Sequence, residues 1–276
     1  TADALPTVQT NGIVWDQVIV GNTVYAAGQF ATARPAGAAA GVNEVARNNV
    51  IAYDIRTGAM TSFAPNVNGQ VRSIAASPDG KRLYAGVGSL TNIADQGMAA
   101  EEGRAAVWEV DLETGAARVF AGGLRNPVGL AWEPGTETLW TVVNERDGLG
   151  DETPPDYLTS VREGGFYGWP YCYWGQTVDD RVKQDAKQVA TALTPDYALG
   201  GHTASLGLCW LPAGYFPGWP EGMAIGQHGS WNRSNLSGYR VIFVPFADGK
   251  PSGEAPRDIL SGFLSPDEKD SWGRPV

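Results

Sequence analysis

The sequence predicts an all-β fold, a β-propeller of four-stranded antiparallel blades, because similar stretches recur along it at a nearly constant spacing. Residues 50–64 read VIAYDIRTGAMTSFA, and residues 106–121 read AVWEVDLETGAARVFA. Asp54 of the first stretch matches Asp111 of the second, 57 residues later. Repetition at a fixed period of this kind is typical of propellers and other repeat folds.

A second pair of stretches repeats at almost the same spacing. Residues 73–87 read SIAASPDGKRLYAGV and residues 129–143 read GLAWEPGTETLWTVV, with Leu83 and Leu139 56 residues apart. Short β-branched and aromatic runs alternate with Asp-Gly, Thr-Gly or Pro-Asp-Gly turns, which indicates antiparallel meanders rather than crossover helices. A β-sandwich is the competing architecture, but it gives no reason for a constant spacing.

Four repeats account for nearly the whole chain, which we therefore treat as one domain over residues 1–276. The repeats run over 12–66, 69–121, 124–175 with an insertion to about 200, and 202–263. Each can supply the four strands of one propeller blade. Residues 272–276 look like the opening strand of a further blade.

Charge and composition exclude several classes of function. The net charge of −10 disfavours nucleic acid, whose phosphates need a surface rich in lysine and arginine. No run of about 18 apolar residues could cross a bilayer, and the chain opens at Thr1 without an apolar leader, so we expect a soluble, processed or excised chain. We expect Cys172 and Cys209 to be small buried side chains, with a single disulfide as the alternative.

Three long connections, 30–46, 144–156 and 176–201, should cluster on one face of a propeller, where ligands bind. The second connection carries carboxylates interleaved with glycines, at Glu145, Asp147, Asp151, Glu152 and Asp156. Oxygen ligands on such a loop suit Ca²⁺, although the spacing is not that of an EF-hand. A solvated acidic loop is the alternative.

Two histidines and one polar pair complete the candidates. His202 and His228 lie at the edges of predicted strands, where an imidazole acts as a base or only hydrogen-bonds a loop. Arg125 and Asn126 stand at the mouth of an apolar strand that would face the central channel, unless they only satisfy a loop. No Ser-His-Asp spacing and no G-x-G-x-x-G motif after a strand is present, so neither a hydrolase elbow nor nicotinamide binding is supported.

Several long strings carry a resemblance to a known family. They include GLRNPVGLAWEPGTETLWTVVNERDGLGDE (123–152), PDYLTSVREGGFYGWPY (155–171) and GQHGSWNRSNLSGYRVIFVPFADGKPSG (226–253). On these strings, residues 88–276 closely resemble the soluble PQQ-dependent sugar dehydrogenases, especially the L-sorbosone dehydrogenase-like branch.

This resemblance implies a six-bladed propeller that binds pyrroloquinoline quinone (PQQ) at the mouth of its channel, with Ca²⁺ bridging quinone and protein. In the family, the quinone takes a hydride from the aldehyde or hemiacetal carbon of a sugar while a histidine removes the hydroxyl proton. The implied partners are therefore a sugar and an electron acceptor. The implied location is periplasmic or secreted, in a bacterium.

The resemblance also assigns the cofactor contacts. By position, Arg125 and Asn126 match the Arg-Asn pair that contacts the quinone. Arg233 and Arg274 fall near the basic residues that hold the cofactor's carboxylates. The planar guanidinium fork of arginine suits such carboxylates.

The family's metal loop follows the next strand. Here it falls on Glu145, Arg146 and Asp147, partly through backbone carbonyls, and Asp151 lies in the same acidic loop. The resemblance therefore implies that these residues hold Ca²⁺.

Two departures from the family bear on activity and ancestry. The catalytic histidine should stand near position 69, but the sequence there reads NVNGQVRSIAASPDGK, with Gly69 and without histidine. His202 is then the candidate for the base. Residues 1–87 instead resemble generic bacterial propeller repeats, so the chain looks like a recombinant of two propellers joined near 84–88.

Four repeats and a stub are fewer than the six blades of the family. Either the ring closes through pairing of residues 272–276 with residues 5–10, or several copies of the chain combine as a homo-oligomer. We expect a PQQ-dependent sugar dehydrogenase, or a derivative of one with strongly impaired turnover. The alternatives are a non-catalytic propeller scaffold, natural or engineered, and a propeller hydrolase in which Ca²⁺ activates water.

Overall fold

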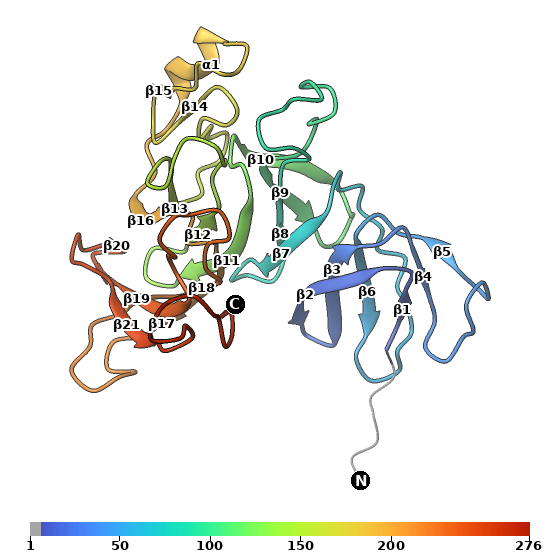
Figure 1. Ribbon diagram of the computed structural model, residues 1–276. Helices are drawn as coiled ribbons and strands as arrows, with labels where there is room; N and C mark the ends of the chain where they lie inside the picture. The colour runs from blue at the N-terminus through green and yellow to red at the C-terminus, as the bar shows by residue number, and fades with distance from the viewer. Residues whose placement is uncertain (1–6) are drawn as a thin grey trace.

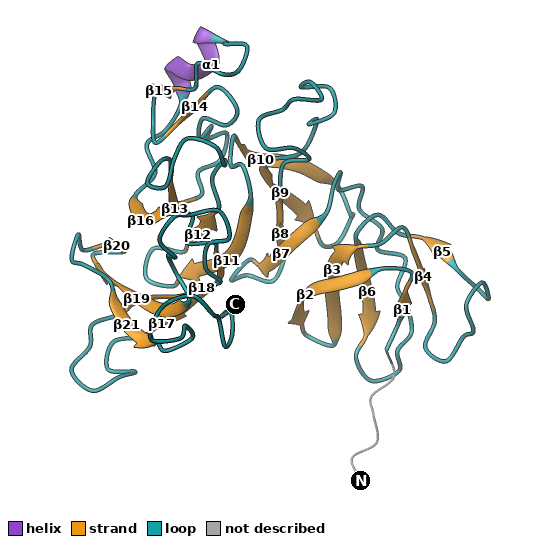
Figure 2. Cartoon of the chain, viewed as in Figure 1, coloured by secondary structure: helices purple, strands orange, loops and turns teal. Residues whose placement is uncertain are grey.

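The computed structural model describes residues 7–276, and their secondary structure is almost entirely antiparallel β-sheet (Figures 1 and 2). The one helix among these residues, α1 (Ala186–Thr191), is short and capped by the side chain of Asp185. The all-β prediction is therefore confirmed. Within residues 7–276, no helix has the length and apolar character that a membrane crossing needs.

The first repeat forms a smaller main sheet than the sequence predicts. This sheet has the order β2-β3-β6, from β2 (Ile13–Val20), β3 (Thr23–Gln29) and β6 (Val50–Asp54). A side sheet has the order β1-β4-β5, from β1 (Gln9–Thr10), β4 (Thr32–Arg34) and β5 (Val45–Ala46). The prediction of a fourth strand is wrong here: after β6 an isolated bridge joins Tyr53 to Met60. Pro65, which has no N–H to donate, follows shortly and disfavours extending the ladder.

The second and third repeats each form a four-stranded antiparallel sheet. The second has the order β10-β9-β8-β7, from β7 (Val71–Ala76), β8 (Arg82–Val87), β9 (Ala106–Asp111) and β10 (Ala117–Gly122). The third has the order β11-β12-β13-β16, from β11 (Pro127–Glu133), β12 (Thr138–Val143), β13 (Pro155–Ser160) and β16 (Tyr197–Gly201).

The insertion between β13 and β16 carries a small hairpin, β14 (Cys172–Tyr173) with β15 (Thr177–Val178), followed by α1. The fourth repeat pairs β17 (Ser205–Leu211), β18 (Gly222–Gln227) and β19 (Arg240–Ala247). Two short strands, β20 (Lys250–Pro251) and β21 (Arg257–Leu260), both pair with β19.

The sheets follow one another around a common centre because their first strands pack together. β2 packs against β7, β7 against β11, and β11 against β17 (Figure 1). Two glycines permit the close approach: a Cβ on Gly86 would lie 2.7 Å from the carbonyl oxygen of Pro127, and one on Gly129 would lie 2.6 Å from that of Leu206. Neighbouring sheets therefore meet at distances that only glycine allows at these points.

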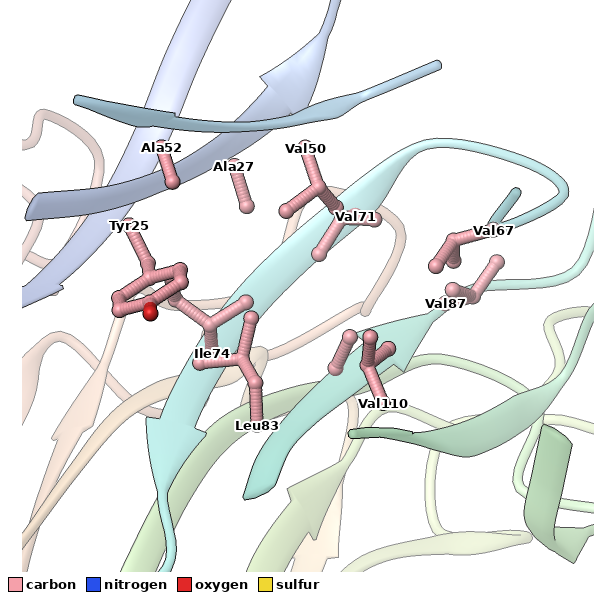
Figure 3. Close-up of a cluster of buried hydrophobic side chains, with 11 residues drawn as sticks. Tyr25, Ala27, Val50, Ala52, Val67, Val71, Ile74, Leu83, Val87 and Val110 are labelled. Atoms are coloured by element: carbon pink, nitrogen blue, oxygen red, sulfur yellow. The ribbon is translucent and has the colours of Figure 1, made fainter. Parts of the chain in front are cut away.

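Buried aliphatic side chains fill the space between the first two sheets (Figure 3). Tyr25 and Val50 of the first sheet pack with Ile74, Leu83 and Val110 of the second. Burying a side chain of this kind stabilises the fold by roughly 1.5–3 kcal/mol. Since Leu83, Ala85 and Val87 of β8 belong to this core, a junction near 84–88 would have to preserve their packing. The recombinant origin stays a prediction.

The expectation of a strand at the chain end is wrong, and the expectation of two buried cysteines holds only for Cys172. Residues 272–276 do not form a strand, and the carbonyl carbon of Val276 lies 2.6 and 2.5 Å from the positions that a Cβ on Gly207 and one on Gly226 would take. Residues 5 and 6 of the expected pairing segment lie outside the described residues, and β1 pairs with β4 instead. Cys172 is buried and Cys209 exposed, and within residues 7–276 both are free thiols.

Candidate functional site

Loops from three sheets meet at one end of the strands. Ser89, just after β8, donates its backbone N–H to the carbonyl of Arg125, at 2.7 Å. Asn144, just after β12, donates its side-chain N–H to the carbonyl of Ser205, also at 2.7 Å. These bonds join the end of β8 to the start of β11, and the end of β12 to the start of β17. Among them lies a cavity of about 110 Å³ whose lining includes Arg125, Glu145, Asp147, Asp156, His202 and Asn232.

Asn92 connects the loop after β8 to this cavity. Its side-chain amide pairs with the main chain of Asp147, accepting from the N–H at 2.9 Å and donating to the carbonyl at 3.0 Å. The same amide oxygen accepts from the guanidinium of Arg125 at 3.0 Å. Trp169 donates its indole N–H to the carbonyl of Asn92, at 3.0 Å. Asn92 therefore positions both Arg125 and Asp147, although they lie 33 and 55 residues away in the chain.

Asp147 stands at the centre of the polar cluster. Its carboxylate accepts from the amide of Asn232 at 2.8 Å and lies 3.4 Å from Nδ1 of His202. Arg125 places a guanidinium nitrogen 3.8 Å from the other carboxylate oxygen and donates to the carbonyl of Glu145 at 3.0 Å. The predicted residues Arg125, Asp147 and His202 are thus brought together.

Both ring nitrogens of His202 face oxygen atoms. Nε2 lies 2.9 Å from the carbonyl oxygen of Gly150, and Nδ1 faces Asp147. The side chain is only 7% exposed, and the backbone has a φ of +55°. In this arrangement neither nitrogen has a free lone pair directed toward a substrate.

Two buried carboxyl groups lie beneath the cavity, at Glu145 and Asp156. Burial raises the pKa of Glu145 to about 7, and this outweighs the lowering by the backbone N–H of Arg146 and the charge of Arg125. Burial likewise raises the pKa of Asp156 to about 6. Asp156 accepts hydrogen bonds from the N–H groups of Glu145 and Ala204, at 2.9 and 2.8 Å, and from the hydroxyl of Thr203, at 3.1 Å.

Three polar atoms beside the cavity lack a protein partner. Nε of Arg125, Oε1 of Glu145 and Oδ1 of Asn232 are buried without a hydrogen bond to any residue from 7 to 276. Because unpaired buried polar atoms are costly, this donor and these two acceptors are groups with which a polar ligand or ordered water can pair. Residues 7–276 contain no group of three or more His, Cys, Asp or Glu side chains suited to a metal. A cation beside Glu145 and Asn232 would therefore also need carbonyl or water oxygens, which Ca²⁺ accepts.

Arg146 turns away from the cavity and anchors the insertion. Its Nε lies 3.1 Å from the carboxylate of Asp179, and both side chains are almost fully buried. In return, Arg181 of the insertion donates to the carbonyl of Gly148. A role for Arg146 in metal binding could therefore involve only its main chain.

The other predicted cofactor contacts lie around the cavity rather than in it. Arg233 pairs with Glu152 and donates to the carbonyl of Gly201 at 3.1 Å. Arg274 packs over the ring of Tyr239 and donates to its hydroxyl at 3.0 Å.

Asn126 and Asp151 are also engaged with the protein. The amide of Asn126 donates to the side chain of Asn144 at 3.4 Å. Asp151 accepts from the N–H of Ser234 at 3.0 Å. The structure thus places these two residues near the cluster without directing them into the cavity.

A histidine at position 69 would be strained with this backbone. Gly69 has a φ of +93°, and a Cβ there would lie 2.8 Å from Val87 and 2.9 Å from the guanidinium of Arg104. The side chain of Arg104 thus occupies the space in which a larger residue would stand.

Two residues of the cluster were not predicted. Asn232 lies next to Arg233 in the GSWNR string, so the resemblance to the family could have suggested it. Asn92 follows no recognisable motif, and only the fold shows that it reaches Asp147. Asp156, predicted only as part of the acidic loop, instead supports the backbone beneath the site.

Sequence relatives include an uncharacterized protein and an aldose sugar dehydrogenase. The chain is 28% identical to an uncharacterized protein of Borreliella burgdorferi over 242 residues, which are 85% of this chain and 62% of that protein. It is 29% identical to the aldose sugar dehydrogenase YliI of Escherichia coli over 142 residues, which are 50% of this chain and 35% of that protein. The chain thus spans less than two thirds of the length of each relative.

Solved structures of similar fold include carbohydrate-oxidising enzymes. A Trichoderma reesei carbohydrate-active enzyme of family AA12 matches with a TM-score of 0.68 and 20% identity, covering 98% of this chain and 83% of that one. The PQQ domain of pyranose dehydrogenase from Coprinopsis cinerea matches with a TM-score of 0.63 and 19% identity, covering 94% and 72%. At these identities the similarity shows a shared fold, which supports the propeller-type architecture.

One family model matches most of the sequence. It is described as TrAA12-like and matches residues 49–269, a range that includes the predicted junction at 84–88. Since this match covers well over half of the sequence, the chain belongs to the TrAA12-like family.

Proposed function

We propose that the chain is a sugar oxidoreductase that uses PQQ and Ca²⁺. The observation that carries this proposal is the convergence of Arg125, Asp147, His202 and Asn232 on one cavity from separate loops. The names of its relatives agree: they include an aldose sugar dehydrogenase and a PQQ-bound aldose sugar dehydrogenase of Streptomyces coelicolor. The chain covers only part of these proteins, so we propose their activity for this chain on the basis of its site.

The residues at the cavity fit both groups in part. Arg125, with an Nε that has no partner within the described part of the chain, would bind an oxygen of the quinone. Glu145, Asp147 and Asn232 would supply oxygen ligands to Ca²⁺. When bound, PQQ supplies a two-electron acceptor for a hydride, and Ca²⁺ supplies a Lewis acid. Arg233 and Arg274 would join only if they left their present partners.

The protein's own contribution includes proton handling. Asp147 orients the imidazole of His202 through Nδ1, the arrangement that a histidine base requires. For His202 to accept a proton from a sugar hydroxyl, Nε2 would have to leave the carbonyl of Gly150. Since Gly69 leaves the family's usual base absent, we expect turnover to be reduced by about 10²- to 10⁴-fold.

Finer features of the proposal rest on the family resemblance. We propose a propeller in which each repeat forms one blade. Additional strands, from a second copy of the chain or from another source, complete the ring. We also propose a sorbosone-like aldose as substrate, a separate electron acceptor, and a periplasmic or secreted location.

An assay of the protein with PQQ, Ca²⁺, an aldose and a redox dye tests the proposal. We expect slow dye reduction that requires the protein, PQQ, Ca²⁺ and the aldose, and that is abolished in His202→Gln. Turnover at rates usual for the family would contradict the loss of the base. Dye reduction unchanged in His202→Gln would remove this residue from the reaction.

A non-catalytic scaffold is the second candidate. It is favoured by the fact that His202, Arg233 and Arg274 all have protein partners in the structure. A scaffold would show no saturable binding of PQQ at any concentration of Ca²⁺. Binding without turnover would instead indicate a dehydrogenase site that has lost its base.

A further inference from the structure

A large cleft adjoins the candidate site on the same side of the molecule. It has a volume of about 710 Å³ and is lined by residues of the loop after β8 and of the insertion that carries α1. This volume falls within the range of roughly 300–1,000 Å³ found for small-molecule sites. The site cavity, at about 110 Å³, is far smaller.

Both walls of the cleft are joined to the loop that carries Asp147. On one wall, Ile93 follows Asn92, whose amide pairs with the main chain of Asp147. On the other wall, Arg181 donates to the carbonyl of Gly148. A molecule in the cleft would therefore contact segments that are hydrogen-bonded to the loop carrying Asp147.

The lining of the cleft combines apolar faces with hydrogen-bonding groups. Tyr171 is half-buried and Met98 is 46% exposed, and together with Ile93 and Pro170 they offer surfaces to the C–H faces of a sugar ring. Lys183 makes no side-chain hydrogen bond with any residue from 7 to 276, so its ammonium can donate to ligand hydroxyls.

The charges in the cleft favour a neutral ligand. Arg181 and Lys183 are balanced by Asp95 and Asp185. The carboxylate of Asp185 is engaged in capping α1, and Arg181 is engaged with Gly148. The charges of these four side chains cancel, so an anionic sugar would gain little electrostatic attraction in the cleft.

We propose that this cleft binds the inner residues of a neutral oligosaccharide whose terminal residue reaches the candidate site. The proposal rests on the proposed function of that site and names its substrate class. It predicts that affinity rises with the number of sugar residues, because additional rings stack on Tyr171 and Met98 while the terminal ring keeps its place.

Calorimetric titration with glucose, maltotetraose and cellotetraose tests the proposal, once on protein loaded with PQQ and Ca²⁺ and once on protein in chelator. We expect at least one tetrasaccharide to bind tenfold or more tightly than glucose. Tyr171→Ala should abolish this advantage, and Tyr171→Phe should retain it. Tyr215→Ala, which removes a tyrosine that is 62% exposed and does not line the cleft, is the matched control.

The outcomes separate this proposal from the proposed function. Equal affinities for glucose and both tetrasaccharides would overturn it, as would an advantage that survives in Tyr171→Ala. Failure of PQQ to bind, with the length dependence intact, would reject the quinone site and leave the cleft. Melting temperatures show whether each variant is folded.

Discussion

The two ends of the strands differ in how far away in the chain the hydrogen-bond partners of their aspartates lie. At one end, the turns after β6 and β9 are nearly identical. Asp54 accepts bonds from two backbone N–H groups and from the hydroxyl of Thr57, and Asp111 accepts the same three kinds of bond, with Thr114 as the hydroxyl donor. Every partner lies within three residues in the chain.

At the other end, the partners are distant. Asp147 receives hydrogen bonds from Asn92 and Asn232, 55 and 85 residues away, and also lies beside Arg125 and His202. Nε of Arg125, Oε1 of Glu145 and Oδ1 of Asn232 are buried there without a hydrogen-bond partner among residues 7–276. At the turn end, the aspartates therefore make their hydrogen bonds within the turn itself. At the loop end, some hydrogen-bonding groups remain unpaired, and a ligand can satisfy them.

The largest expected effect is a difference in stability between variants of a buried aspartate, Asp156, and of a turn aspartate, Asp111. Asp156→Ala leaves two backbone N–H groups and the hydroxyl of Thr203 without their acceptor. We expect the free energy of unfolding to fall by about 3–5 kcal/mol. Asp111→Ala should cost much less, because water can replace the carboxylate. Urea denaturation of both variants measures the difference, and equal losses would contradict it.

The next effect concerns pH. Burial raises the pKa of Glu145 from 4.5 to about 7, so the folded state holds a proton that the unfolded state releases. The resulting stability is complete below pH 4.5 and is lost as pH rises through 7. We expect this loss to be about 2–3 kcal/mol in a chelator such as EDTA.

Glu145→Gln should flatten that profile, since its side chain does not titrate. Asp156, whose pKa is raised to about 6, should leave a smaller decline at lower pH. Glu113→Gln, in the turn after β9, is the matched control. Denaturant titrations between pH 4.5 and 7.5 provide the measurement; a parental slope in Glu145→Gln would show that this carboxyl does not cause the decline.

A smaller loss of stability is expected on substitution of Asn92, a residue that the sequence did not predict to be part of the site. Asn92→Ala removes three side-chain hydrogen bonds to Arg125 and Asp147. We expect a loss of about 1–2 kcal/mol in the free energy of unfolding. Asn22→Ala, at the exposed turn between β2 and β3, should change it little. If the two variants behave alike, Asn92 does not hold the loops together.

The sequence predicted the turn end well because its information is local. The match of Asp54 with Asp111 identified two turns whose bonds are the same in the structure. The missing fourth strand after β6 was not predictable from spacing alone, because it depends on how far pairing extends beyond Met60.

The sequence predicted the site only in part. Arg125 and Asp147 were named through the family resemblance and His202 as a substitute for the missing base, and the three do converge. Asn92 was missed because no pattern shows that its loop crosses to another sheet. The directions of Arg146 and Arg233 also escaped prediction, since their partners Asp179 and Glu152 are set by the packing of loops.

Titration of the protein with PQQ, with and without Ca²⁺, tests the central claim most directly. The account predicts saturable, Ca²⁺-dependent quenching of tryptophan fluorescence. It predicts that Arg125→Ala weakens binding by about tenfold to a hundredfold, through loss of a charge-assisted contact. Arg118→Ala, at the turn end, should bind as the parent does. Absence of saturable binding, or equal affinities for the two arginine variants, would contradict the assignment of the loop end as a quinone site.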